Sequence, residues 1–282
     1  IAEEFFSSVY PTISSGETSK VIIVSTPHGM NMFYKLWMDA VNKKNDYIPM
    51  EVHWSEVPGR DEAWKIQTIR NTSESQFQTE FECEFLGSID TLINVSKLKN
   101  LAVVDPQKSP GGLDVYEMPI KNHTYVMTVD VARGIQNDYS AVVVIDATKA
   151  PYKIVAKYRN NNIKPIVFPN ILKKIGNHYN KAYCLIEIND LGQQVADAMQ
   201  FELEYDNMMM VTQRGRSGQV LGGGFSGRGN QLGLRMTKGT KKIGTSNLKS
   251  LVESDKLIIQ DFDIISELST FIARGKSFEA EQ

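Results

Sequence analysis

The fold of this chain is decided by the stretch Tyr125-Val-Met-Thr-Val-Asp130-Val-Ala-Arg-Gly-Ile-Gln-Asn-Asp138-Tyr-Ser-Ala-Val-Val-Val-Ile-Asp146. Two apolar, β-branched runs flank a short link that holds the turn residues Gly134 and Asn137. This pattern predicts two antiparallel strands joined as a hairpin. The first run ends in Asp130. A carboxylate that follows core residues is costly to place there unless it has a partner, and a metal ion is a usual partner.

A second acid follows the same pattern, because the run Tyr183-Cys-Leu-Ile-Glu187-Ile places Glu187 inside an apolar strand. Taken alone, each residue is more simply explained as a strand-end Asp or as a Glu in a salt bridge. Two acids on two core strands, in this order, favour a metal site. Asp138 either turns back toward the same site from the hairpin or forms part of the turn. Asp146 and Asp190 are weaker candidates, since Asp at a strand end is usually a cap or turn residue.

The elements expected after residue 122 follow the order of a ribonuclease-H-like fold, with a mixed central sheet flanked by helices. In that order the fourth strand lies beside the first and parallel to it, so Asp130 and Glu187 face each other near the carboxyl ends of neighbouring strands. Two carboxylates there can share Mg²⁺ ions about 4 Å apart, which activate water and stabilise the leaving oxygen in phosphodiester cleavage. The expected elements are strands at 124–130, 140–146 and 152–158, a helix at 165–180, a strand at 183–188, a helix at 191–204, a strand at 207–212, a helix at 245–254, a strand at 257–259 and a helix at 262–273.

The first 90 residues predict a separate α/β unit. We expect a buried strand at 20–27, a second strand at 48–55, and a long helix at 61–85 with a break near residue 72. Further helices are expected at 3–14 and 31–41. Weak periodicity and several Pro and Gly residues mark 87–119 as a linker. The sequence therefore predicts a domain boundary near residue 90, with one domain at 1–90 and another at 91–282.

Charge is distributed unevenly along the 282 residues: the net charge is −2 overall, −7 for residues 1–90 and +5 for residues 91–282. Residues 207–252 hold no Asp or Glu, and a glycine-rich, uniformly positive segment suits the phosphate backbone of nucleic acid. The alternative is a solvated loop. No apolar run approaches the about 20 residues of a membrane span. The basic residues of the segment are Arg214, Arg216, Arg228, Arg235, Lys238, Lys241, Lys242 and Lys249.

Taken together, these stretches resemble the large terminase subunit of tailed bacteriophages, of the T-even-like kind. The resemblance implies a packaging motor with an N-terminal P-loop-type ATPase domain and a C-terminal ribonuclease-H-like nuclease domain, which moves DNA into the prohead and cuts concatemers. It covers nearly the whole chain and lies in Lys20-Val-Ile-Ile-Val-Ser-Thr-Pro-His-Gly29, Ser75-Gln-Phe-Gln-Thr-Glu-Phe-Glu-Cys-Glu-Phe-Leu-Gly87, Thr128-Val-Asp130 through Asp138-Tyr139, Leu185-Ile-Glu187-Ile-Asn189, and Thr240-Lys-Lys-Ile-Gly-Thr-Ser-Asn-Leu-Lys249 with 257–259.

By position, the resemblance makes Asp130 and Glu187 catalytic metal-binding acids and Asp138 a further acid beside them, while Ser25 and Thr26 belong to the motif that couples ATP hydrolysis to movement. The implied cofactor is Mg²⁺, for which Mn²⁺ can substitute. The implied partners are double-stranded DNA, the portal protein and the small terminase subunit, in the cytoplasm of an infected bacterium, outside the mature virion and without a membrane. The DNA-binding candidates are Arg214, Arg216, Arg228, Lys238, Lys241 and Lys242.

The resemblance also implies elements outside this chain. The Walker motifs that bind ATP belong upstream of Ile1, so we expect ATP to serve the full-length motor only. A third catalytic Asp belongs shortly after Gln282. Two other functions stay open, a DNA-gripping or portal-docking module with little chemistry, and another ribonuclease-H-like nuclease such as a resolvase or transposase. The segment 20–27 and the acidic first domain argue against the latter.

Overall fold

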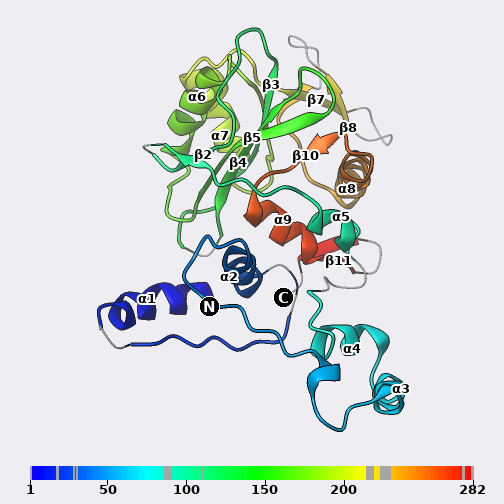
Figure 1. The fold of residues 1–282 in the computed structure, drawn as a ribbon. Helices are drawn as coiled ribbons and strands as arrows, with labels where there is room; N and C mark the ends of the chain where they lie inside the picture. Colours follow the sequence, from blue (N-terminus) through cyan, green and yellow to red (C-terminus); the bar gives the residue numbers. More distant parts are fainter. Residues whose placement is uncertain are drawn as a thin grey trace. The chain divides into compact units, whose positions relative to one another are not determined.

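The computed structural model describes residues 2–16, 19–27, 29, 31–85, 91–109, 111–136, 138–213, 219–222, 230–274 and 277–280. The chain divides into two compact units, one formed by residues 1–98, 265–274 and 279–282, the other by residues 99–264 and 275–278. Figure 1 shows the helices and strands of both units. None of the helices in the described ranges is long and apolar enough to cross a membrane.

The second unit is built on a seven-stranded sheet. The strands β3 (Tyr125–Asp130), β4 (Ser140–Asp146) and β5 (Tyr152–Asn160) form an antiparallel meander, and β6 (Tyr183–Ile186) lies parallel to β3 on the other side. The predicted ribonuclease-H-like order is therefore confirmed. Part of the predicted linker joins this sheet, because the spatial order is β1-β2-β5-β4-β3-β6, with β10 parallel to β5. These three further strands are β1 (Gln107–Lys108), β2 (Leu113–Val115) and β10 (Leu257–Ile258).

One face of this sheet carries the core. Side chains alternate along each strand, so Met127 and Val129 of β3 are buried on the same face as their cross-strand neighbours Val144 and Val142. Two helices, α6 (Phe168–His178) and α7 (Gly192–Asp197), pack on that face, and a short π-helical turn, η2 (Ala198–Glu202), continues α7. The predicted helices at 165–180 and 191–204 are thus present with shifted ends. The buried helix residues are Phe168, Leu172, Ile175, Val195, Ala196 and Met199.

The segment after η2 forms a small second sheet and a long helix. The strands β7 (Met210–Gln213), β8 (Gln219–Gly222) and β9 (Asn230–Leu232) pair antiparallel in the order β8-β7-β9, where a glycine-rich loop was expected after β7. Helix α8 (Lys238–Glu253) begins seven residues before its predicted start. The reason is a capping box: the Thr240 backbone N–H donates to Thr237 Oγ1 at 3.2 Å, and the Thr237 N–H donates to Thr240 Oγ1 at 2.7 Å.

Two charged residues of this sheet, Lys157 and Asp146, have partners close by. Lys157 of β5 is buried, and its Nζ lies 2.6 Å from a carboxylate oxygen of both Asp261 and Asp263 at the start of α9 (Phe262–Ser269). Asp146 at the end of β4 accepts a hydrogen bond from Thr148 Oγ1 at 2.6 Å, which agrees with the cap or turn role expected for it. The helix predicted at 262–273 ends at Ser269, and β11 (Phe271–Arg274) follows and pairs with β12 (Ser277–Ala280).

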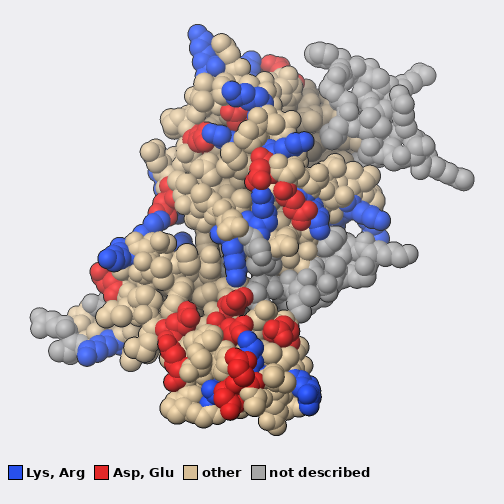
Figure 2. Space-filling view, turned by 45° about the vertical axis from the view of Figure 1, so that its right-hand side comes forward, with Lys and Arg blue, Asp and Glu red and all other residues tan. Residues whose placement is uncertain are grey.

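The first unit is mainly helical. Asp61 caps α3 and Ser73 caps α4, so the predicted break near residue 72 is confirmed, although the second helix ends at Glu80 rather than near 85. Acidic side chains gather over α3 and α4 (Figure 2), in keeping with the negative balance of this part of the sequence. The helices are α1 (Ala2–Ser14), α2 (Met32–Val41), η1 (Trp54–Glu56, a 3₁₀ turn), α3 (Glu62–Asn71), α4 (Glu74–Glu80) and α5 (Val95–Lys99).

Both strands predicted in the first unit are wrong. Residues 20–27 have no ladder partner within the described ranges, and Ile22 and Val24 are 84% and 88% exposed. Residues 48–53 are likewise without a ladder there, and Trp54 opens the 3₁₀ turn instead. A strand needs a neighbour for its backbone N–H and C=O groups, and the apolar composition of these segments does not by itself supply one.

Candidate active site

The two predicted acids stand at the ends of two neighbouring parallel strands. β3 and β6 run in register, with Val129 opposite Ile186. The backbone N–H of Glu187 donates to the carbonyl of Val129 at 2.9 Å, so the pairing continues one residue beyond the assigned end of β6. Glu187 therefore directly follows β6, whereas the sequence predicted that it lies inside the strand. Asp130 is the last residue of β3, so the structure brings both carboxylates to the same edge of the sheet.

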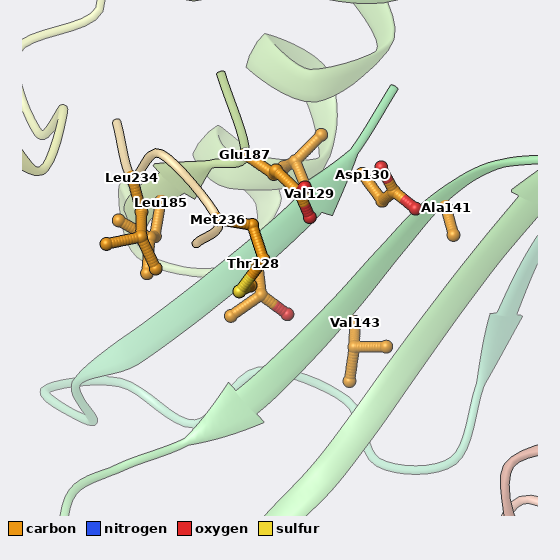
Figure 3. A pocket seen from close by; sticks show the side chains of 9 residues that line it. All are labelled: Thr128, Val129, Asp130, Ala141, Val143, Leu185, Glu187, Leu234 and Met236. Carbon is orange, nitrogen blue, oxygen red and sulfur yellow. The ribbon is translucent and has the colours of Figure 1, made fainter. Parts of the chain in front are cut away.

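Strand alternation puts both acids on the face of the sheet opposite α6 and α7. Thr128 and Asp130 point to this open face because Met127 and Val129 point to the core. Here lies a pocket of about 330 Å³ (Figure 3). Ala141 is the cross-strand partner of Asp130, and its small side chain leaves space beside the carboxylate. The pocket is lined by Thr128, Val129, Asp130, Ala141, Val143, Leu185, Glu187, Leu234 and Met236.

The segment before α8 forms one wall of the pocket. Leu234 pairs with Glu187 in a parallel bridge, and the N–H of Ile188 donates to the carbonyl of Leu234 at 3.0 Å. Asn189 holds the next residues, since its Nδ2 donates to the Met236 carbonyl and its Oδ1 accepts from the Met236 N–H, both at 3.0 Å. These contacts fix Leu234 and Met236 beside Glu187, and they bring the first turn of α8 to the site.

Two glycines allow the backbone around Glu187 to pack this closely. A Cβ added at Gly192 would lie 1.7 Å from the carbonyl oxygen of Glu187. A Cβ added at Gly233 would lie 2.4 Å from the carbonyl oxygen of Ile186, and Gly233 also has φ +75°. Any larger residue at either position would push on the backbone that carries the acid.

The acids in and beside the pocket carry like charges, and each pKa reflects its neighbours. The Asp130 side chain reaches solvent in the pocket, but partial burial raises its pKa, and the nearby charge of Asp138 raises it further against a hydrogen bond from the Val131 N–H. Burial also raises the pKa of Glu187, Asp130 adds to this rise, and the charge of Lys241 opposes it. The charge of Asp130 therefore acts on Glu187, and the charge of Asp138 acts on Asp130.

The other predicted residues take different places. Asp138 is exposed and acts on Asp130 through its charge, but it does not line the pocket. Lys241 in the first turns of α8 is half-buried near Glu187, while Lys238 and Lys242 are exposed on the same helix. Ser25 and Thr26 belong to the first unit, where both are exposed and Ser25 Oγ donates to the Thr26 carbonyl at 2.8 Å. Arg214, Arg216 and Arg228 lie outside the described residues.

Several residues that shape the site carry no clear signal in the sequence. Gly192 and Gly233 resemble ordinary loop glycines, and Asn189 resembles an ordinary turn residue. Arg133 donates a hydrogen bond to Asp190, which joins the loops that follow β3 and β6. The local sequence around Asp190 predicts only a turn. A usable signal is position, because each of these residues lies within five residues of a predicted acid or beside the segment that pairs with it.

The donor set fits a hard divalent cation. Asp130 and Glu187 offer carboxylate oxygens from two strands to one pocket, and oxygen is the ligand that Mg²⁺ prefers. Burial raises the pKa of both carboxyls, and the charge of Lys241 lowers that of Glu187. Within the described residues no three His, Cys, Asp or Glu side chains already form a complete ligand cluster.

Comparison with known proteins gives two family matches and a set of similar folds. A family described as the terminase RNaseH-like domain matches residues 127–279, more than half of the chain. A second, described as the N-terminal part of the T4likevirus-type terminase large subunit, matches residues 3–100.

The large terminase nuclease of thermophilic phage G20c with bound magnesium is similar to this chain with a TM-score of 0.52 and 18% identity, over 69% of this chain and 90% of that one. The same nuclease with bound cobalt gives 0.51 and 19%, over 68% and 89%. At this identity the likeness to these structures shows a shared fold, whereas the two family matches show the family of the chain. The chain belongs to the large terminase subunit family.

Proposed function

We propose that this chain is the metal-dependent DNA endonuclease part of a viral DNA-packaging motor, which cuts concatemeric genomic DNA during packaging into the prohead. The observation that carries the proposal is the pair Asp130 and Glu187, brought by parallel neighbouring strands to one pocket with raised pKa values. The family supplies the context of packaging, and the pocket supplies a place for phosphodiester chemistry.

Asp130 and Glu187 would hold Mg²⁺, or Mn²⁺ in its place, with Asp138 as a further acid beside them. A divalent cation bound there supplies an activated water and stabilisation of the leaving oxygen in phosphodiester hydrolysis, in the manner of two-metal sites. The chain contributes the positioning: the β3–β6 pairing sets the separation of the two acids, and Gly192 and Gly233 allow the Glu187 backbone to sit where it does. Lys241 places a positive charge beside Glu187, where the substrate phosphate would arrive.

Double-stranded DNA would run along α8 into the pocket. Lys238 and Lys242 are exposed near the start of this helix, and no acid occurs from residue 207 to 252. Such a surface binds phosphates without regard to sequence. Arg214, Arg216 and Arg228 belong to the same acid-free segment and would extend the contact.

The remaining roles follow from the family context. We propose that residues 1–90 are the C-terminal part of the ATPase domain, with Ser25 and Thr26 in its coupling motif, and that residues 91–282 are the nuclease domain. ATP would serve the full-length motor. The partners would be the portal protein and the small terminase subunit, in the cytoplasm of an infected bacterium. The family matches support these roles over a resolvase or transposase.

A second function, DNA gripping with little chemistry, is favoured by the exposed lysines of α8. The two functions differ in their dependence on the acids. Asp130→Asn and Glu187→Gln in the full-length protein should each lower the cleavage of supercoiled plasmid with Mg²⁺ by roughly 10²–10³-fold, since a metal ligand contributes several kcal/mol to the transition state. Duplex binding should persist in both variants.

The control is Asp206→Asn, an exposed acid that pairs with Lys181 at 3.6 Å. It should cleave like the parent. Melting temperatures should stay equal or rise in Asp130→Asn and Glu187→Gln, because neutralising one acid relieves the repulsion between them. Undiminished cleavage by both variants would refute the assignment and leave only the gripping function.

A further inference from the structure

The loops that follow β3 and β6 are joined by an ion pair a few residues from the acids of the pocket. Arg133 Nε donates to Asp190 Oδ2 at 3.0 Å, and Arg133 Nη2 lies 2.9 Å from the same oxygen. Arg133 comes three residues after Asp130, and Asp190 comes three residues after Glu187. Three residues span at most about 11 Å, so both side chains lie close to the acids without lining the pocket.

This pair is not needed to hold either loop in place. On one side, the Ala132 N–H donates to Ser140 Oγ at 3.0 Å, and the Gln136 N–H donates to the carbonyl of Asn161 at 3.0 Å. Gly134 lies so close to Ile163 that an added Cβ would be 2.3 Å from its carbonyl oxygen. The backbone on both sides of Arg133 is therefore fixed by other contacts.

The backbone around Asp190 is fixed as well. Asn189 makes two hydrogen bonds with the backbone of Met236, and the Gly192 N–H donates to the Asn189 carbonyl at 3.1 Å. The Arg133 and Asp190 side chains are 64% and 57% exposed, and exposed ion pairs contribute little to stability. A purely structural role therefore explains the pair poorly.

The pair does place a positive charge near acids that would otherwise repel the DNA. Asp130, Glu187 and Asp138, which would attract a metal ion, also repel a phosphate. A guanidinium is always charged, has five N–H donors in a planar fork and binds phosphate through two of them at once. Both contacts to Asp190 go to one oxygen and leave the Nη1 group of Arg133 without an acceptor among the described residues.

We propose that Arg133 binds a phosphate of the DNA strand beside the pocket, and that Asp190 holds the guanidinium in position until the phosphate replaces it. The inference rests on the proposed nuclease function and adds a DNA-binding residue to it. Asp190 acts in two ways: it orients Arg133 in the free protein, and its carboxylate competes with the phosphate. The two residues therefore have opposite effects on DNA affinity.

The test is duplex binding by fluorescence anisotropy, in EDTA so that no cleavage occurs, over a series of salt concentrations. Arg133→Ala should weaken binding about five- to tenfold and lower the slope of log affinity against log salt by about 0.9, the value for one phosphate contact. Asp190→Asn should strengthen binding about two- to fivefold, because it removes the competing charge and keeps Arg133. Arg133→Lys should fall between Arg133→Ala and the parent, since it keeps the charge but loses the fork.

The matched controls are Lys181→Ala and Asp206→Asn, which break an ion pair with side chains 67% and 76% exposed in the same unit. Both should bind DNA within twofold of the parent. Weaker binding by Asp190→Asn would show that the pair is a structural link and would overturn the proposal, as would parental binding by Arg133→Ala. A parent that shows no salt-dependent binding would overturn the nuclease function together with this inference, whereas a parent that binds while both variants match it overturns the inference alone.

Discussion

Gly192→Ala should disable the site without touching any acid. An added Cβ would lie 1.7 Å from the carbonyl oxygen of Glu187 and 2.8 Å from its carbonyl carbon. Carbon and oxygen atoms that are not bonded approach to about 3.3 Å at their closest common distance. The Glu187 backbone or the start of α7 must therefore move by roughly 1.5 Å relative to the other.

The consequence for activity follows from the size of this shift. A misplacement of about 1 Å at a reacting centre can cost about 10²-fold in rate, so we expect plasmid cleavage with Mg²⁺ to fall at least that far. Overpacking should also lower the free energy of unfolding by about 1–3 kcal/mol. Affinity for Mn²⁺, measured by titration, should fall together with cleavage, because Glu187 is one of the two acids proposed to hold the ion.

The matched control separates damage to the site from loss of stability. A Cβ added at Gly176 in α6 would lie 2.2 Å from the hydroxyl oxygen of Tyr205, so Gly176→Ala also overpacks the core, on the face of the sheet away from the acids. It should lose a similar stability and keep parental cleavage when assayed below its melting temperature. Cleavage at the parental rate by Gly192→Ala, or an equal loss in both variants, would refute the reasoning.

Three further predictions concern charge. Burial alone would raise the pKa of Asp146, yet its hydrogen-bond partners hold this pKa below its ordinary value. The ionised carboxylate therefore stabilises the fold above about pH 4, and this contribution is lost as the pH falls through the folded pKa. The melting temperature of the parent should thus drop more steeply below pH 4 than that of Asp146→Asn. Replacing Lys157 by Met should lower the free energy of unfolding by about 3–5 kcal/mol in urea titrations, because it leaves the buried carboxylate of Asp261 without its cation; a smaller change than about 1 kcal/mol would contradict this. Changing Lys238 and Lys242 together to Ala should flatten the salt dependence of duplex binding by up to about two units, and an unchanged slope would place the DNA elsewhere.

The sheet could be predicted from the sequence because its strands follow simple local rules. The runs of β3, β4 and β5 are apolar and β-branched, and short turns separate them, so an antiparallel meander is the simplest pairing. Placing the next strand beside β3 then put Asp130 and Glu187 at one edge. The order of elements thus carried the location of the acids, although not the fact that Glu187 lies one residue beyond β6.

The rest of the site depends on contacts between distant residues. Asn189 reaches Met236 across 47 positions, and Arg133 reaches Asp190 across 57. Neither pair has a local pattern that distinguishes it from ordinary turn residues. The prediction of a strand at 20–27 was wrong for a related reason. The composition favoured a strand, but a strand must pair with a neighbour, and the local sequence does not reveal whether one is present.

The pocket is also where the chain departs from the rules that otherwise govern its core. On the face of the sheet that α6 and α7 cover, every position of β3 is filled by a buried apolar side chain, whereas the opposite face carries Thr128, Asp130 and the small residue Ala141 around a pocket of about 330 Å³. Apolar residues there would remove two carboxylates whose pKa values are raised by burial and by neighbouring negative charge, and they would fill the space with stabilising contacts. A fold that leaves this space open and charged gives up stability there, and functional sites are where such local conflicts are expected. The same reasoning explains why neutral variants of the acids should melt no lower than the parent while losing cleavage.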